Sequence, residues 1–146
     1  IGNTCDVKSL CAFLDSQDVK GELPKTGLFT LNPADNAALA VLTGSYSQDG
    51  VVGKVQFGPA WWYNDHFYGM TDQLENLAAY SLMPQFIGMT TDSRNVLSFS
   101  RHDYFRRILC GLIGDMVENG LYPYTDELED IIKDISYNNA KNYFGI

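Results

Sequence analysis

The hydrophobic positions of the chain form two kinds of pattern. Apolar residues three and four apart indicate amphipathic helices over 6–14, 37–42, 69–82 and 104–118. Short apolar runs bounded by turn-forming or polar residues indicate buried strands at 27–31, 52–57 and 86–89. Because these strands alternate with helices, we expect an α/β fold with about three parallel strand-helix units, followed by closing helices.

Local signals place several helix ends. Asp6 is suited to cap the first helix, and Pro33 suits the first turn of the second. Gly44 stands where a C-terminal cap of the second helix is expected, and Pro84 stops the third. Further helices are expected from 125 to 135 and over 138–144. Since the chain has no linker or low-complexity tract, residues 1–146 form one segment.

Composition and charge exclude several classes of function. The chain is 45% hydrophobic and 13% aromatic, which fits a folded domain. Its net charge of -8 argues against binding to nucleic acid. Arg101, Arg106 and Arg107 recur at helical spacing and indicate a solvated or ion-paired helix face. No run approaches the roughly 18 apolar residues of a membrane span, so no membrane contact is expected.

The three cysteines, Cys5, Cys11 and Cys110, lack metal-ligand spacing and lie in apolar surroundings typical of buried thiols. Their odd number and these surroundings favour a reducing compartment. We therefore expect a cytoplasmic protein.

An aromatic loop follows the second expected strand. Trp61 and Trp62 lie in this loop, beyond the break at 58–59. Aromatic side chains in loops at the carboxyl ends of parallel strands often face a sugar or another ligand. They can equally pack beneath the loop as anchors, and from residue type alone both interpretations stay open.

An acid and a guanidinium follow the third expected strand. Asp92 stands at its end, in the string 91–94, and Arg94 lies two residues further on. Such an aspartate can bind a metal or take a proton, and such an arginine can hold a carboxylate through two hydrogen bonds. A structural pair or a helix cap is the alternative.

The two histidines do not form a metal motif. His66 and His102 lack a partner at metal-binding spacing. His102 begins a helix and is expected to be a surface or capping residue, whereas His66 lies in the aromatic loop.

Four strings of residues, together with their order and spacing, resemble the C-terminal portion of the uronate (glucuronate) isomerases. These strings are 53–58 (GKVQFG), 61–65 (WWYND), 91–94 (TDSR) and 101–110 (RHDYFRRILC). The segment 138–144 is similar to the terminal signature of that family, and 23–36 is similar to the segment before it. The resemblance covers nearly the whole chain.

The resemblance implies the C-terminal part of a (β/α)8 TIM barrel of the amidohydrolase superfamily. The implied reactions are the aldose-ketose isomerisations of D-glucuronate to D-fructuronate and of D-galacturonate to D-tagaturonate. Asp92 would end the eighth strand as metal ligand or general base. Arg94 would bind the hexuronate, and Trp61 and Trp62 would line the sugar site.

The resemblance also implies a divalent metal, with zinc expected, held by a His-x-His that these 146 residues lack. We therefore expect a fragment that is inactive as an isolated chain. One alternative is a non-catalytic module for assembly or ligand binding, and another is a different metal hydrolase on the same scaffold. A homo-oligomer stays open.

Overall fold

Two short parallel strands form the sheet at the centre of the fold. The computed structural model describes residues 5–46, 50–90 and 92–146. Within them, β1 (Thr26–Leu28) pairs with β2 (Val55–Phe57), with Thr26 opposite Val55 and Leu28 opposite Phe57. The parallel register agrees with the α/β class expected from the sequence.

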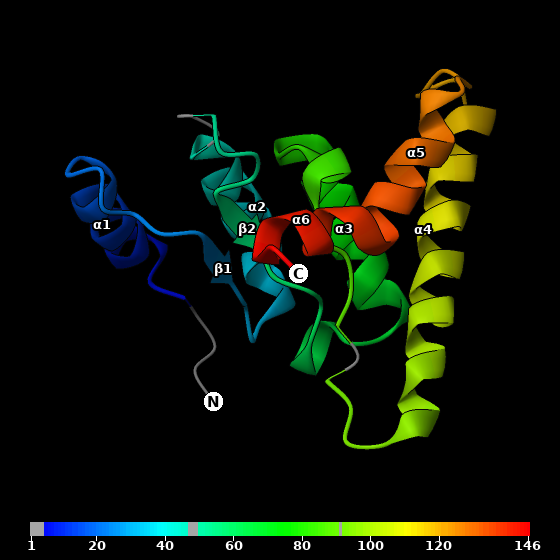
Figure 1. The fold of residues 1–146 in the computed structure, drawn as a ribbon, viewed down its shortest axis with the longest axis horizontal. Coiled ribbons are helices and arrows are strands. Elements are labelled where there is room, and N and C mark those ends of the chain that lie inside the picture. Colours follow the sequence, from blue (N-terminus) through cyan, green and yellow to red (C-terminus); the bar gives the residue numbers. More distant parts are fainter. Residues whose placement is uncertain (1–4, 47–49, 91) are drawn as a thin grey trace.

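Helices account for most of the remaining chain (Figure 1). The α-helices are α1 (Val7–Asp18), α2 (Asn36–Ser45), α3 (Phe67–Tyr80), α4 (Ser100–Glu118), α5 (Glu127–Lys133) and α6 (Asn139–Phe144). Short 3₁₀ turns cover Pro33–Asp35, Trp62–Asn64, Met83–Gln85 and Val96–Phe99, and a π-helical turn, Asp134–Asn138, joins α5 to α6. In Figure 1, α1 and α4 lie on opposite sides, with the strands, α2 and α3 between them.

The helix signals of the sequence are confirmed except at Gly44. Asp6 caps α1 by accepting a hydrogen bond from the backbone N–H of Ser9, at 3.0 Å. Gly44 does not end α2, which continues to Ser45. A Cβ at Gly44 would lie 2.9 Å from the carbonyl oxygen of Tyr80. The glycine therefore allows α2 to pack closely against α3.

The expected strand at 86–89 is wrong. This segment is not part of the sheet, and the other two strands are shorter than the apolar runs that predicted them. Gly88 has a left-handed backbone with φ of 77°, outside the range of a regular strand. The 3₁₀ turn just before this segment contacts β2 through a side chain, since Gln56 donates to the carbonyl oxygen of Gln85 at 3.0 Å.

One hydrophobic core fills the space between the strands and the helices. Its most deeply buried apolar side chains come from α1, β2, α2, α3, α4, the segment after α3 and the π-helical turn. These are Leu14, Phe57, Leu39, Leu74, Leu109, Phe86 and Ile135. Residues from near both ends of the chain therefore share one core. Among the described residues, no helix is both long and apolar enough to cross a bilayer.

The C-terminal segment is attached to the starts of the strands. The hydroxyl of Tyr143 donates to the carbonyl oxygen of Lys54, just before β2, at 3.0 Å. Lys25, just before β1, donates to the carbonyl oxygen of Tyr143 at 2.7 Å. Asn139 donates to the carbonyl oxygens of Pro84 and Phe86. The carboxyl ends of the strands are consequently left to the loops that follow them.

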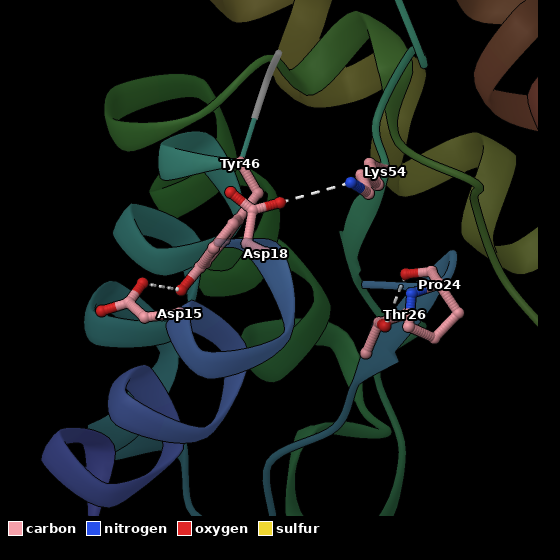
Figure 2. A network of polar contacts seen from close by, with 6 residues as sticks. All are labelled: Asp15, Asp18, Pro24, Thr26, Tyr46 and Lys54. Atoms are coloured by element: carbon pink, nitrogen blue, oxygen red, sulfur yellow. Dashed lines mark hydrogen bonds and ion pairs between the residues drawn. The ribbon is translucent and has the colours of Figure 1, made fainter. Parts of the chain in front are cut away.

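Helix α1 is joined to the rest of the fold by two polar contacts, which Figure 2 shows. The buried Tyr46 donates its hydroxyl to Asp15 at 2.6 Å, and Lys54 forms an ion pair with Asp18 at 3.3 Å. Burial, and then the hydrogen bond to Asp15, raise the pKa of Tyr46 above its ordinary value. Both contacts join α1 to segments outside it.

The expectation of buried cysteines is wrong for two of the three. Cys5 and Cys110 are exposed, Cys11 is half-buried, and none forms a disulfide. The apolar neighbours of Cys110 lie on the buried face of α4, while Cys110 itself lies on the solvent face.

Candidate functional site

The aromatic loop after β2, residues 58–66, is held by side chains from three other elements. Gln73 in α3 is buried and donates to the carbonyl oxygen of Gly58 at 2.8 Å. At the other end of the loop, Asp65 forms an ion pair with Arg101 of α4. The buried Asn64 bonds to Asn36 of α2. Side chains of α2, α3 and α4 therefore attach the loop at its two ends.

The two indoles of the loop lie against each other. The ring centroids of Trp61 and Trp62 are 5.7 Å apart, and Trp61 meets Phe29 edge to face at 6.0 Å. Trp61 is half-buried, whereas Trp62 is 55% exposed and has a left-handed backbone with φ of 55°. Such a conformation is strained in a tryptophan and is most often retained at functional positions.

The indole nitrogen of Trp61 is buried and has no hydrogen-bond partner among the described residues. A buried N–H without a partner costs about 1–3 kcal/mol. A group outside the described residues, in a ligand or in another segment, would remove this cost.

Asp92 and Arg94 lie in the loop between the extended segment 86–90 and α4. Both side chains are exposed, and within the described part of the chain neither forms a hydrogen bond or an ion pair. Asp92 has a left-handed backbone with φ of 44°. Thr91, in the same string, lies outside the described residues. Asp92 and Arg94 therefore do not form the structural pair, and Asp92 does not form the helix cap, that the sequence left open.

The two tryptophans contact each other directly. Asp92 and Arg94 lie in a different loop, and the helix α4 that follows it contacts the aromatic loop. Arg101, at the start of α4, forms the ion pair with Asp65 in the aromatic loop. The first turn of α4 therefore lies beside the aromatic loop, whereas Asp92 and Arg94 precede the 3₁₀ turn Val96–Phe99 that leads into this helix. The sequence predicts for Arg101 only a place on a charged helix face, and this prediction is confirmed for Arg106 and Arg107, which pair with Asp103.

The histidines have structural positions. The Nδ1 atom of His66 accepts a hydrogen bond from the backbone N–H of Gly69 at 3.2 Å and so caps α3. His102 is half-buried in the first turn of α4 and is not its cap. No group of three or more histidine, cysteine or carboxylate side chains that could hold a metal occurs among the described residues.

The two parallel strands and the helices packed around them define an α/β protein. Residues 1–144 match the profile of the glucuronate isomerase (UxaC) family. The chain belongs to this family.

Curated relatives agree with this assignment. The chain is 51% identical to the uronate isomerase of Caldanaerobacter subterraneus subsp. tengcongensis, over 100% of the chain and 32% of that protein. It is 53% identical to the uronate isomerase of Caldicellulosiruptor bescii, over 94% of the chain and 30% of that protein. The chain thus spans about a third of the length of these relatives.

A solved structure is similar as well. The crystal structure of uronate isomerase from Thermotoga maritima matches with a TM-score of 0.81 and 36% identity. The match covers 94% of this chain and 28% of that protein.

Proposed function

We propose that this chain is the C-terminal third of a uronate isomerase and supplies one side of its hexuronate site. The observation that carries the proposal is the family match over residues 1–144, together with the loops that carry Trp61 and Asp92. Uronate isomerases match nearly the whole chain, so a non-catalytic module is not favoured.

The intact protein would be a (β/α)8 barrel in the cytoplasm. β1, β2 and the extended segment 86–90 would be its sixth, seventh and eighth strand positions. The left-handed Gly88 does not prevent this, because the eighth position would pair with a first strand that lies outside this chain. Reactive groups would then gather at the carboxyl ends of the strands, where the loops at 58–66 and 91–95 begin.

The reaction would interconvert D-glucuronate with D-fructuronate, and D-galacturonate with D-tagaturonate. After ring opening, a proton must leave the carbon next to the aldehyde and return to the aldehyde carbon. Asp92 is exposed and has no partner among the described residues, so its carboxylate is available to carry this proton. Arg94, also without a partner, would hold the uronate carboxylate.

The indoles would form the wall of the sugar site. Trp61 would offer its buried N–H to a sugar hydroxyl or carboxylate, which would satisfy that donor. Trp62 would present its exposed ring to the apolar face of the sugar.

A divalent metal, with zinc expected, would polarise the substrate carbonyl when bound. Within 5–46, 50–90 and 92–146, the donors do not make a complete site, and Asp92 fits as one oxygen ligand at most. The other ligands would have to come from the two-thirds of the relatives' length that this chain does not cover.

A chimera tests the proposal directly. This chain would replace the corresponding third of the Thermotoga maritima uronate isomerase, and conversion of D-glucuronate would be followed. We expect an active chimera, and we expect Asp92→Asn to lower kcat by about 10²- to 10⁴-fold, the usual contribution of a general acid or base. Arg94→Lys should mainly raise KM, because a point charge replaces a two-pronged contact.

The control is Arg107→Lys, which changes an exposed arginine paired with Asp103 on the solvent face of α4. A folded chimera whose turnover is unaffected by Asp92→Asn would refute the assigned role. The isolated 146-residue chain should show no turnover.

A further inference from the structure

The start of α2 and the end of the aromatic loop are joined by a pair of buried amides. Asn36 is the first residue of α2, and Asn64 ends the 3₁₀ turn that begins at Trp62. Each side chain is 1% exposed. Asn36 donates to the side-chain oxygen of Asn64 at 3.1 Å, and Asn64 donates back to that of Asn36 at 3.3 Å.

Asp72 completes this arrangement. Its carboxylate accepts a second hydrogen bond from the amide nitrogen of Asn36, at 2.6 Å. The bond orients the Asn36 amide, so that its oxygen faces the amide nitrogen of Asn64. Because the pair is buried, its hydrogen bonds are stronger than they would be in water, and a mispaired group is costly there.

The backbone around Asn64 is also tightly packed. A Cβ at Gly69, in the first turn of α3, would lie 2.4 Å from the carbonyl oxygen of Asn64. Only glycine lets α3 approach the loop so closely. Asn64 is thus held by α2 through its side chain and by α3 through its backbone.

We propose that Asn36 and Asn64 are positioning residues that fix the indoles of Trp61 and Trp62 at the rim of the site. The pair joins the start of α2, the helix that follows β1, to the end of the turn that begins at Trp62. The loop needs this support because Trp62 has a left-handed backbone, a conformation that persists only where its surroundings enforce it. The inference rests on the proposed function only for the identity of the ligand.

The chain is well suited to a test, because its two tryptophans both lie in this loop. The tryptophan emission of the 146-residue chain, excited at a wavelength that tyrosine does not absorb, therefore reports on the loop alone. In Asn64→Asp, a carboxylate oxygen replaces the amide nitrogen that faces the oxygen of Asn36. We expect a red shift of the emission maximum, with far-UV circular dichroism unchanged.

We also expect acrylamide quenching to rise, because the half-buried indole of Trp61 would become exposed while that of Trp62 is exposed already.

A matched control distinguishes positioning from general loss of stability. Asn139 also donates two hydrogen bonds, but to the carbonyl oxygens of Pro84 and Phe86. These two acceptors lie at or just before the start of the extended segment 86–90, away from its carboxyl end. Asn139→Asp should lower the unfolding midpoint and leave the tryptophan emission of the folded chain unchanged. Equal red shifts in Asn64→Asp and Asn139→Asp, or no shift in Asn64→Asp, would overturn the inference.

A charge swap supplies the rescue. Asn36→Asp alone places a second carboxylate against Asp72 and should shift the emission strongly. Adding Asp72→Asn removes the repulsion and places an amide N–H donor opposite the new carboxylate at position 36. The double variant should therefore recover most of the native emission. A double variant no closer to native than Asn36→Asp would count against the pair. Should Asn64→Asp fail to fold, this comparison still decides the inference.

Titration of the native chain with D-glucuronate separates the inference from the proposed function. Quenching by D-glucuronate but not by D-glucose would support the uronate site. A red shift in Asn64→Asp without any response to D-glucuronate would uphold the positioning role, and turnover of D-glucuronate by the chimera would then decide the uronate site separately.

Discussion

Replacing Gly88 with alanine should destabilise the chain far more than the same change at another left-handed glycine. Gly88 has φ of 77°, and a Cβ there would lie 2.1 Å from the carbonyl oxygen of Ile135. Ile135 is fully buried in the π-helical turn between α5 and α6. The added methyl group would therefore have to push that turn away from the extended segment.

Two terms make up the expected cost. Holding alanine in a left-handed conformation costs about 1–2 kcal/mol. Moving the π-helical turn also strains the two hydrogen bonds that Asn139 donates to Pro84 and Phe86, each worth about 0.5–1.5 kcal/mol. The sum is about 2–5 kcal/mol, which is a large part of the stability of a typical domain.

Gly120 provides the matched control. Its φ is 70°, yet a Cβ there would meet nothing within 4 Å. Gly120→Ala therefore carries the backbone cost alone, and the difference between the variants measures the contact with Ile135. The assay is urea unfolding followed by circular dichroism. If Gly88→Ala and Gly120→Ala lowered the free energy of unfolding equally, the packing argument would be refuted.

Two further variants test the polar contacts. Tyr46→Phe removes the hydrogen bond to Asp15 and should cost about 1 kcal/mol. Burial raises the pKa of Tyr46 in the folded state. The contribution of its neutral hydroxyl to the free energy of unfolding is therefore complete below the unfolded pKa of about 10 and is lost as the pH rises above that value. Denaturant titrations should thus show a shallower alkaline decline in Tyr46→Phe; an equal decline would contradict this. Arg101→Met removes the ion pair with Asp65 and should red-shift the tryptophan emission, whereas unchanged emission would mean that α4 does not hold the loop.

The helices were predictable because their signals are local. The apolar face of α4 recurs every three to four residues, and the structure has this helix at Ser100–Glu118, close to the expected span. The cap at Asp6 also needs only residues three apart. Signals of this kind depend on nearby side chains and survive without knowledge of the rest of the fold.

The third strand was not predictable from its residues. The apolar run at 86–89 is typical of a buried strand, but the left-handed backbone of Gly88 accompanies a contact with Ile135, far along the chain. The candidate site was likewise predictable only in part. Residue types drew attention to Trp61 and Asp92, whereas asparagines such as Asn64 are common in turns and give no sign of a buried pair.

The sequence by itself determined the α/β class, the order of the helices and the family, because periodicity and motif spacing are properties of short stretches of chain. The tertiary structure alone decided which polar groups are paired. It buries Asn36 against Asn64, joins Arg101 to Asp65, and leaves Asp92 exposed. The physical reason is that hydrogen bonding and burial depend on distances between residues remote in sequence, which are set only when the helices pack around the strands.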